Sequence, residues 1–325
     1  MATIREVAKR AGVSVATVSN AITENRSVNA ETRARVLRAA KELNYKPNLM
    51  ASSMVTKKTN IIGIFFYNFA EKNFLPYSEF LKGVTLTCQR RGQRVLVYTD
   101  VTEEQFHEGF ILGNEPIDAG IIFFPQEDEF RANDLKYASL PFVFVGKCRG
   151  FSFVDCENKK LTYRLTKKLI DAGNRKICFF NSDPNWMLTK DRRAGFYAAL
   201  DEARIERKQC AEYNENYENC EIFLADAFER GFRAFVVESP RMVRAIYERC
   251  LRDGLRIGKD VSVVFLGYDP QFDLMTPSLT CAKLSYEELG QSAVELIERV
   301  KKINVPQEVY LEASVIEGNS IARMR

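Results

Sequence analysis

Two hydrophobic patterns divide the chain. In residues 1–47, apolar side chains recur three and four positions apart, which predicts three short helices that begin near residues 4, 15 and 30. From residue 61 onward, short runs of Val, Ile and Phe alternate with amphipathic helical stretches. This alternation predicts parallel β-sheets that carry helices on both faces. The segment 61–325 is long for a single core, so we expect two α/β lobes.

The predicted strands occupy the most continuous apolar runs, and the predicted helices lie between them. The strands are 61–66, 94–98, 120–124, 142–145, 176–180, 234–237 and 262–266, and the helices are 77–91, 158–172, 190–203, 241–253 and 285–302. Ligands of parallel α/β sheets bind beyond the carboxyl ends of the strands. We therefore expect a small-molecule site in a cleft between the two lobes.

Local signals mark the ends of the first helices. Thr3 and Glu6 form the Thr-x-x-Glu pattern of a capping box. Gly12 stands where a tight turn needs positive φ, and Ser14 can cap a second helix. That helix turns Val18 inward and leaves its leading residues outside. A helix, a short glycine turn and a second short helix form the helix-turn-helix pattern, which places its second helix in the major groove of DNA.

A third helix and a linker complete this segment. Asn29 is the predicted cap of a helix over 30–43, while Asn44 and Pro47 are typical of a helix end. Residues 48–59 follow as a short linker that we expect to become helical only when it is supported.

Positive charge is concentrated in the helical segment. Residues 1–60 carry 11 Lys and Arg against 4 Asp and Glu, whereas the whole chain has a net charge of only +4. A basic module on a near-neutral body indicates nucleic-acid binding. The alternatives are a solvated basic tail and a three-helix module that binds protein. The helical patterning disfavours the tail, and the basic charge with exposed short polar side chains disfavours the protein-binding module.

Composition argues against several other classes of protein. At 46% apolar and 28% charged residues, the chain has an ordinary soluble composition. It contains no apolar stretch long enough to span a bilayer, and its first residues lack a signal-peptide pattern. We therefore expect a cytoplasmic protein with no membrane partner. The eight cysteines show no paired spacing, which suits reduced, buried thiols.

Motifs for catalysis and cofactors are also missing from the sequence. His107 is the only histidine, so we interpret it as a structural or surface residue and expect no metal site. There is no dinucleotide-binding fingerprint, and 254–260 fails the spacing of a P-loop, so we interpret it as the loop before a strand. We expect a protein that is not an enzyme and that needs no cofactor.

The first sixty residues resemble one family closely. Regulators of the lactose-repressor (LacI/GalR) family begin with a sequence similar to the run Thr3-Ile4-Arg5-Glu6-Val7-Ala8-Lys9-Arg10-Ala11-Gly12-Val13-Ser14-Val15-Ala16-Thr17-Val18-Ser19. The similarity continues in register at Glu31-Thr32-Arg33, Leu43-Asn44-Tyr45-Lys46-Pro47-Asn48 and Ala51-Ser52-Ser53-Met54. The resemblance implies a helix-turn-helix DNA-binding headpiece at 1–47 and a hinge helix or linker at 48–60.

The resemblance also implies particular DNA contacts. Val15, Ala16 and Asn20 stand at base-reading positions, where Asn pairs with adenine and small apolar side chains suit thymine methyl groups. The positions that contact the DNA backbone are Thr3, Ser14, Thr17, Asn29 and Tyr45. In the hinge, Ala51 and Met54 would lie in the minor groove, and Met54 replaces the Leu that the family usually wedges between base pairs. The alternative for Met54 is a loop residue in a small apolar contact.

The body resembles the same family more weakly but in the same order. Similar segments include Asp191-Arg192-Arg193-Ala194-Gly195-Phe196 and Leu266-Gly267-Tyr268-Asp269. The implied fold class is a small all-α helix-turn-helix headpiece plus an α/β, two-lobed, periplasmic-binding-protein-like (type I) effector domain. We expect 61–325 to bind effector and to dimerise. The expected lobes are about 61–157 plus about 285–310, and about 158–284 plus the C-terminal strand.

Two candidate effector contacts, Arg192 and Asp269, match effector-contact positions of the family. Trp186 is a third candidate because it lies in the loop before the Arg192 helix, and Phe74 is a fourth because its segment aligns with the family's first-lobe ligand loop. Charged side chains in a cleft can hydrogen-bond sugar hydroxyls in pairs, and an aromatic ring can stack on a sugar face. The alternatives are a salt bridge for Arg192 and Asp269 and core packing for Trp186. Phe74 belongs to the segment Asn68–Tyr77, which departs from the family's pattern.

The function that the resemblance implies is sequence-specific DNA binding by a transcription regulator, a repressor, under the control of a small-molecule effector. A carbohydrate is the expected effector, and a nucleobase corepressor is the alternative. A solute-binding protein would share the body but would not carry residues 1–60. We expect a homodimer on a near-palindromic double-stranded DNA operator, because the chain lacks the heptads of a tetramerising coil.

Overall fold

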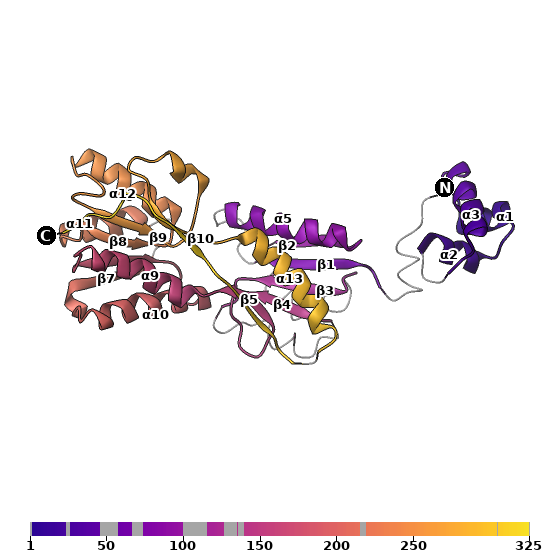
Figure 1. Cartoon of the computed structure of the whole chain (residues 1–325), viewed down its shortest axis with the longest axis horizontal. Coiled ribbons are helices and arrows are strands. Elements are labelled where there is room, and N and C mark those ends of the chain that lie inside the picture. Colours follow the sequence, from indigo (N-terminus) through magenta and orange to yellow (C-terminus); the bar gives the residue numbers. More distant parts are fainter. Residues whose placement is uncertain are drawn as a thin grey trace. The chain divides into compact units, whose positions relative to one another are not determined.

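The structure, a computed structural model, describes residues 2–23, 27–45, 58–66, 74–99, 116–126, 135, 140–214, 219–303 and 305–324 (Figure 1). The chain forms two compact units, Met1–Thr59 and Asn60–Arg325. The predicted hinge contacts Ala51 and Met54, and the single histidine His107, lie outside the described residues.

The first unit is built from the three predicted helices, α1 (Ile4–Ala11), α2 (Val15–Thr23) and α3 (Ala30–Glu42). Each helix contributes a fully buried valine, Val7, Val18 and Val36, to a shared core. Apolar side chains one helical turn apart therefore meet in the middle of the unit, as their spacing predicted.

The predicted end signals that lie within the described residues are confirmed, whereas Pro47 lies outside them. Thr3 and Glu6 form a complete capping box at the start of α1, and Gly12 ends the helix at φ 66° in the left-handed region. The Asn29 side chain caps α3, and Asn44 adopts φ 48° just after it. Gly12 therefore permits the turn between α1 and α2, because a residue without a Cβ adopts this positive φ without strain.

The first lobe of the second unit contains a parallel sheet in the order β11-β5-β4-β3-β1-β2 (Figure 1). Its strands are β1 (Ile61–Phe66), β2 (Arg94–Thr99), β3 (Ala119–Phe123), β4 (Phe142–Val145), β5 (Phe153–Cys156) and β11 (Glu308–Leu311). The described helices of this lobe are α5 (Phe74–Arg90) and α13 (Tyr286–Val300), which pack against each other. The inner strands are buried along their length, as sheets covered on both faces require.

Two glycines allow α5 and α13 to pack closely. A Cβ on Gly83 of α5 would lie 2.0 Å from the carbonyl oxygen of Glu287, and a Cβ on Gly290 of α13 would lie 2.3 Å from that of Phe80. Because both obstacles are backbone atoms, no side-chain rotation would make room. This crossing ties a helix near the start of the second unit to one near its end.

The second lobe contains a sheet in the order β12-β10-β9-β8-β6-β7, parallel except for the pairing of β10 with β12. Its strands are β6 (Ile177–Asn181), β7 (Cys210–Asn214), β8 (Ala234–Val237), β9 (Ser262–Phe265), β10 (Thr280–Lys283) and β12 (Ser314–Ile316). Its helices are α9 (Asn158–Asp171), α10 (Met187–Glu202), α11 (Cys220–Glu229) and α12 (Pro240–Arg252), with short 3-10 turns η2 (Arg207–Gln209) and η3 (Pro270–Leu274).

The chain passes between the two sheets three times, from β5 to α9, from β10 to α13 and from β11 to β12 (Figure 1). All seven predicted strands and all five predicted helices of the body are present, with ends shifted by a few residues. The sequence analysis assigned no residues to β5, β7, β10, β11 or α11, and the structure adds these elements. Residues 254–260 form the predicted loop before β9.

Candidate functional site

The first turn of α2, which forms its leading face, exposes apolar and small side chains. Val15 is 42% exposed and Ala16 is exposed, whereas Val18 and Ala21 are buried in the core. Asn20 is half-buried on the same short helix. An exposed Val at the first position of a helix is not explained by the packing of the unit. The face suits contact with a partner that presents methyl groups and hydrogen-bonding edges.

Three of the predicted DNA-backbone residues occur at helix N-termini. Thr3 precedes α1 and Asn29 precedes α3, where its Oδ1 accepts hydrogen bonds from the amides of Glu31 (2.8 Å) and Thr32 (3.1 Å). Before α2, the Ser14 hydroxyl accepts from the Thr17 amide at 3.1 Å. Helix N-termini carry a partial positive charge and orient amides outward, so they bind phosphate oxygens.

The other two predicted backbone residues lie close to these elements. The Thr17 hydroxyl is 2.9 Å from that of Ser14, so both belong to the first turn of α2. Tyr45 is half-buried and packs against the core of the unit. No acidic residue stands in the first turn of α2, which leaves the positive end of that helix uncompensated by a local carboxylate.

In the second lobe, Arg192 lies at the centre of a buried polar cluster. Its Nη1 is 2.8 Å from Oε1 of Glu238, which directly follows β8, and the two side chains are only 5% and 7% exposed. Its Nε donates to Asn158 Oδ1 at 3.2 Å, and its Nη2 donates to the carbonyl oxygen of Leu266 at 3.3 Å. The carboxyl ends of β8 and β9 and the start of α9 therefore converge on one guanidinium.

Asp155 extends this cluster at the end of β5. Its carboxylate accepts hydrogen bonds from the amides of Lys147 (3.0 Å) and Cys156 (2.7 Å) and from Asn158 Nδ2 (2.9 Å). Burial nevertheless raises the pKa of Asp155 to about 6, because desolvation of the carboxylate outweighs these hydrogen bonds.

Asp269 is buried at the end of the segment that follows β9. Its Oδ1 accepts a hydrogen bond from the Gln271 amide at 2.9 Å and so caps η3. Sequence reasoning selected Arg192 and Asp269 but missed Glu238, Asn158 and Asp155. The available signal was that polar side chains which end or directly follow apolar strands gather at one edge of a parallel sheet.

Trp186 connects the two lobes. It is the residue before α10, it forms an isolated antiparallel bridge with Gln126, and its ring lies 6.1 Å from that of Phe124. Both partners follow β3 of the first lobe. Phe74 is the first residue of α5, and the rest of the predicted first-lobe ligand segment before it, Asn68–Asn73, lies outside the described residues.

All eight cysteines are buried free thiols. Within the described ranges, no group of three or more His, Cys, Asp or Glu is placed to hold a metal ion. The same ranges contain no helix with the length and apolar character needed to cross a membrane.

Comparison with family models gives two matches in this chain. The model described as bacterial regulatory proteins, lacI family, matches residues 3–48. The model described as a periplasmic binding protein-like domain matches residues 166–321. The first match covers the three-helix unit, and the second covers most of the second lobe.

Curated relatives are similar along nearly the whole chain. The HTH-type transcriptional repressor PurR of Proteus mirabilis is 30% identical over 338 residues, which cover 99% of this chain and 97% of that protein. The ribose operon repressor of Haemophilus influenzae is 28% identical over 340 residues, covering 99% and 98%.

A solved structure supports the same architecture. The lac repressor dimer bound to operator and the anti-inducer ONPF matches with a TM-score of 0.86 at 23% identity, covering 99% of both chains. The predicted fold class, a helix-turn-helix headpiece with a two-lobed periplasmic-binding-protein-like domain, is therefore confirmed.

Proposed function

Because the chain belongs to the lacI family of bacterial regulatory proteins, we propose that it is a DNA-binding transcriptional repressor controlled by a small molecule. The observation that carries this proposal is the exposed leading face of α2 on a basic three-helix unit, with Val15 at 42% exposure. The two-lobed body supplies the second half of the function. The polar cluster at its strand ends is suited to a ligand rather than to catalysis.

In the proposed complex, α2 lies in the major groove. Asn20 pairs with an adenine edge, while Val15 and Ala16 contact thymine methyl groups. The groups that contact the DNA backbone are Thr3, Ser14, Thr17, Asn29 and Tyr45, and they fix the register of the unit on the duplex. Ala51 and Met54 of the hinge segment lie in the minor groove, where Met54 wedges between base pairs.

The effector site is proposed beside Arg192 and Asp269, with Trp186 as an aromatic platform and Phe74 as a first-lobe contact. The charge of Arg192 is already balanced by Glu238 at 2.8 Å. An anionic ligand would add a second negative charge to one buried cation, whereas a neutral ligand would not. Guanidinium donors next to carboxylate acceptors suit neighbouring hydroxyl groups, which favours a carbohydrate.

The mechanism couples two binding equilibria. Two copies bind a near-palindromic operator with one three-helix unit on each half-site. The effector binds with one affinity to the arrangement of the lobes that is competent for DNA binding and with another to the incompetent arrangement. The difference between these two affinities sets the limit on how far the effector changes operator affinity. Because its target is the chromosome, we place the protein in the cytoplasm.

A two-step experiment tests the proposal. A thermal-shift screen of neutral sugars and nucleobases with the full chain identifies ligands, and each hit is then added to gel shifts on selected operator duplexes. A sugar that shifts both the melting temperature and the operator affinity supports the proposal. A nucleobase hit with the same two effects would replace the carbohydrate assignment. Failure to prefer any duplex over random competitor DNA at moderate salt would contradict DNA regulation itself.

A further inference from the structure

Phe124, the residue after β3, has a backbone conformation that is unusual for an aromatic residue. Its φ is 47°, in the left-handed region, where the Cβ of an L-residue is crowded by the following carbonyl oxygen. Its amide nevertheless donates to the carbonyl oxygen of Val145 at 2.8 Å. The next residue, Pro125, lies so close to Gly146 that a Cβ there would come within 2.8 Å of Pro125 Cδ. The end of the sheet therefore holds Phe124 in a strained conformation.

The strained residue reverses the alternation of side chains along β3. Ile122 belongs to the apolar cluster on one face of the sheet, and Phe123 belongs to the cluster on the other face. A regular strand would return the next side chain to the side of Ile122. Phe124 instead packs beside Phe123, with the ring centroids 4.2 Å apart. The left-handed backbone therefore places two consecutive aromatic rings on the same side of the sheet.

Across the two lobes, the ring of Phe124 meets that of Trp186. The ring centroids are 6.1 Å apart, and the ring planes are inclined by 30°. The backbone of Trp186 also forms an antiparallel bridge with Gln126, two residues after Phe124. Both aromatic side chains are half-buried. A ring contact and a backbone bridge thus join the same two segments, one from each lobe.

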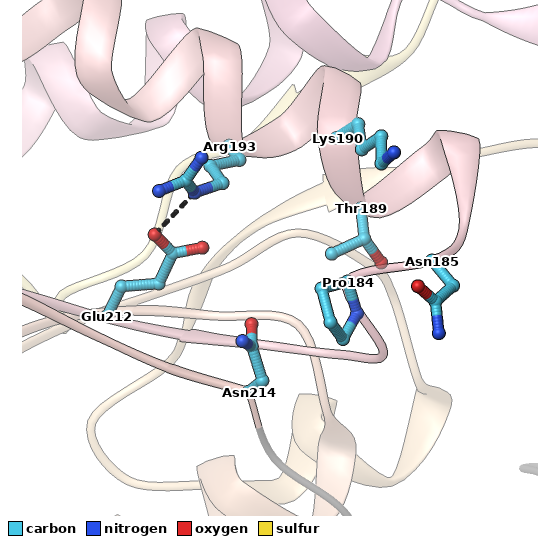
Figure 2. A pocket seen from close by; sticks show the side chains of 7 residues that line it. All are labelled: Pro184, Asn185, Thr189, Lys190, Arg193, Glu212 and Asn214. Carbon is cyan, nitrogen blue, oxygen red and sulfur yellow. Dashed lines mark hydrogen bonds and ion pairs between the residues drawn. The ribbon is translucent and has the colours of Figure 1, made fainter. Parts of the chain in front are cut away.

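Trp186 is tied to the second lobe through α10, which it directly precedes. Arg192 of this helix pairs with Glu238 after β8. The next residue, Arg193, pairs with Glu212 of β7 at 2.7 Å, and Figure 2 shows this pair between the helix and the strand. Because two ion pairs fix α10 to the second sheet, we expect Trp186 to move with that sheet when the lobes move.

The ring contact lies away from the places where the chain crosses between the lobes (Figure 1). The crossings use β5 and β11 of the first sheet and β10 and β12 of the second, and these strands lie together at one side of each sheet. Phe124 follows β3, two strands from β5, and Trp186 follows β6, three strands from β10. Since neighbouring strands are about 4.8 Å apart, these offsets are roughly 10 and 14 Å. A rotation of the lobes about the crossings would therefore separate the rings.

We propose that Phe124 and Trp186 form an aromatic latch, which holds the two lobes of the second unit closed in the absence of a ligand. The left-handed backbone directs the ring of Phe124 to Trp186. Opening of the lobes exposes both ring faces to water, so burial and ring contact favour the closed arrangement. The consequence for the effector rests on the proposed function: a ligand that enters the cleft separates the rings, and their faces can then stack on it.

Distances between the lobes of the full chain test the latch without effector or DNA. Spin labels at Arg91→Cys, before β2, and Lys208→Cys, before β7, report opening by double electron–electron resonance. Both sites are exposed and adjoin the sheet edges opposite the crossings, and the eight natural cysteines are buried. We expect one closed population in this protein. Phe124→Asn, which tolerates positive φ but has no ring, and Trp186→Ala should each raise the open population about fivefold.

Non-additivity identifies the ring contact itself. Because each variant removes the same contact, Phe124→Asn/Trp186→Ala should open the lobes no further than either single variant. Trp186→Phe keeps an aromatic ring and should stay closed. Phe151→Asn is the matched control, because Phe151 is also half-buried but its ring partner, Phe144 at 5.3 Å, belongs to the same lobe. This control should leave the distances between the lobes unchanged.

Three results would overturn the latch: unchanged distances in both single variants, additive opening in the double variant, or equal opening in Phe151→Asn. Near-UV circular dichroism checks that each variant is folded. The measurement contains neither DNA nor effector, so its failure would leave the proposed repressor function standing. A failure of operator binding would likewise leave the latch standing.

Discussion

The guanidinium of Arg192 and the carboxylate of Glu238 form an ion pair at 2.8 Å, with both side chains more than nine-tenths buried. Removing one member of a buried pair leaves the other charge without compensation in a medium that solvates it poorly. The pair is therefore as much a structural constraint on the second lobe as a candidate ligand contact.

Arg192→Leu is expected to lower the free energy of unfolding by roughly 3–5 kcal/mol, because Glu238 would remain buried alone. The double variant Arg192→Leu/Glu238→Leu should recover most of that loss. Urea denaturation followed by Trp186 fluorescence measures the second lobe directly. Equal stability of the single variant and the natural chain would show that the pair is solvated in solution.

The stability of the natural chain should depend on the ionisation of Asp155. Its pKa is raised from 3.8 to about 6 by burial, so the folded state holds a proton that the unfolded state releases. This proton stabilises the folded state fully below about pH 4, and the stabilisation is lost as the pH rises through 6. The shift in pKa corresponds to about 3 kcal/mol of unfolding free energy.

Asp155→Asn cannot titrate and provides the reference. Compared at pH 4 and pH 7, the unfolding free energy of the natural chain should fall by roughly 2–3 kcal/mol relative to the variant. A difference between the two proteins that stays constant across this range would show that Asp155 has an ordinary pKa.

Two substitutions at Asn29 separate its structural role from its proposed contact with DNA. Asn29→Ala removes the cap of α3 and should destabilise the three-helix unit by about 1 kcal/mol. Asn29→Asp keeps the cap but places a negative charge toward phosphate. We expect its melting temperature to stay near that of the natural chain while its operator affinity falls severalfold in fluorescence anisotropy. Unchanged affinity would mean that Asn29 only caps the helix.

Asn20→Ala tests base reading by α2. The variant should lose discrimination at one operator position, by about 1–3 kcal/mol, while keeping its affinity for random DNA. Competition binding against a set of single-base operator variants makes the measurement. Uniform weakening on every duplex would instead place Asn20 among the backbone contacts.

The sequence predicted best where one apolar pattern determines the element. Strands β4 and β8 are uninterrupted runs of Val, Phe and Ala, and both were predicted with their observed bounds. Strand β7 was missed because it is an edge strand whose sequence, Cys-Ala-Glu-Tyr-Asn, is half polar. Helix α11 was missed because seven of its ten residues are apolar, which weakens the helical period.

Arg192 and Asp269 became candidates only through the family resemblance. Arg192 was selected by that resemblance, but its partner Glu238 follows a different strand, and no local spacing relates the two.

The three passages of the chain between the sheets have a consequence for dissecting the molecule. Neither lobe is a continuous stretch of sequence, since the first needs β11 from near the carboxyl end and the second needs β12 beyond it. Cutting the gene at the β5–α9 junction would therefore not release two independently folding halves. Mixed together, however, the two fragments hold every strand needed to rebuild both sheets.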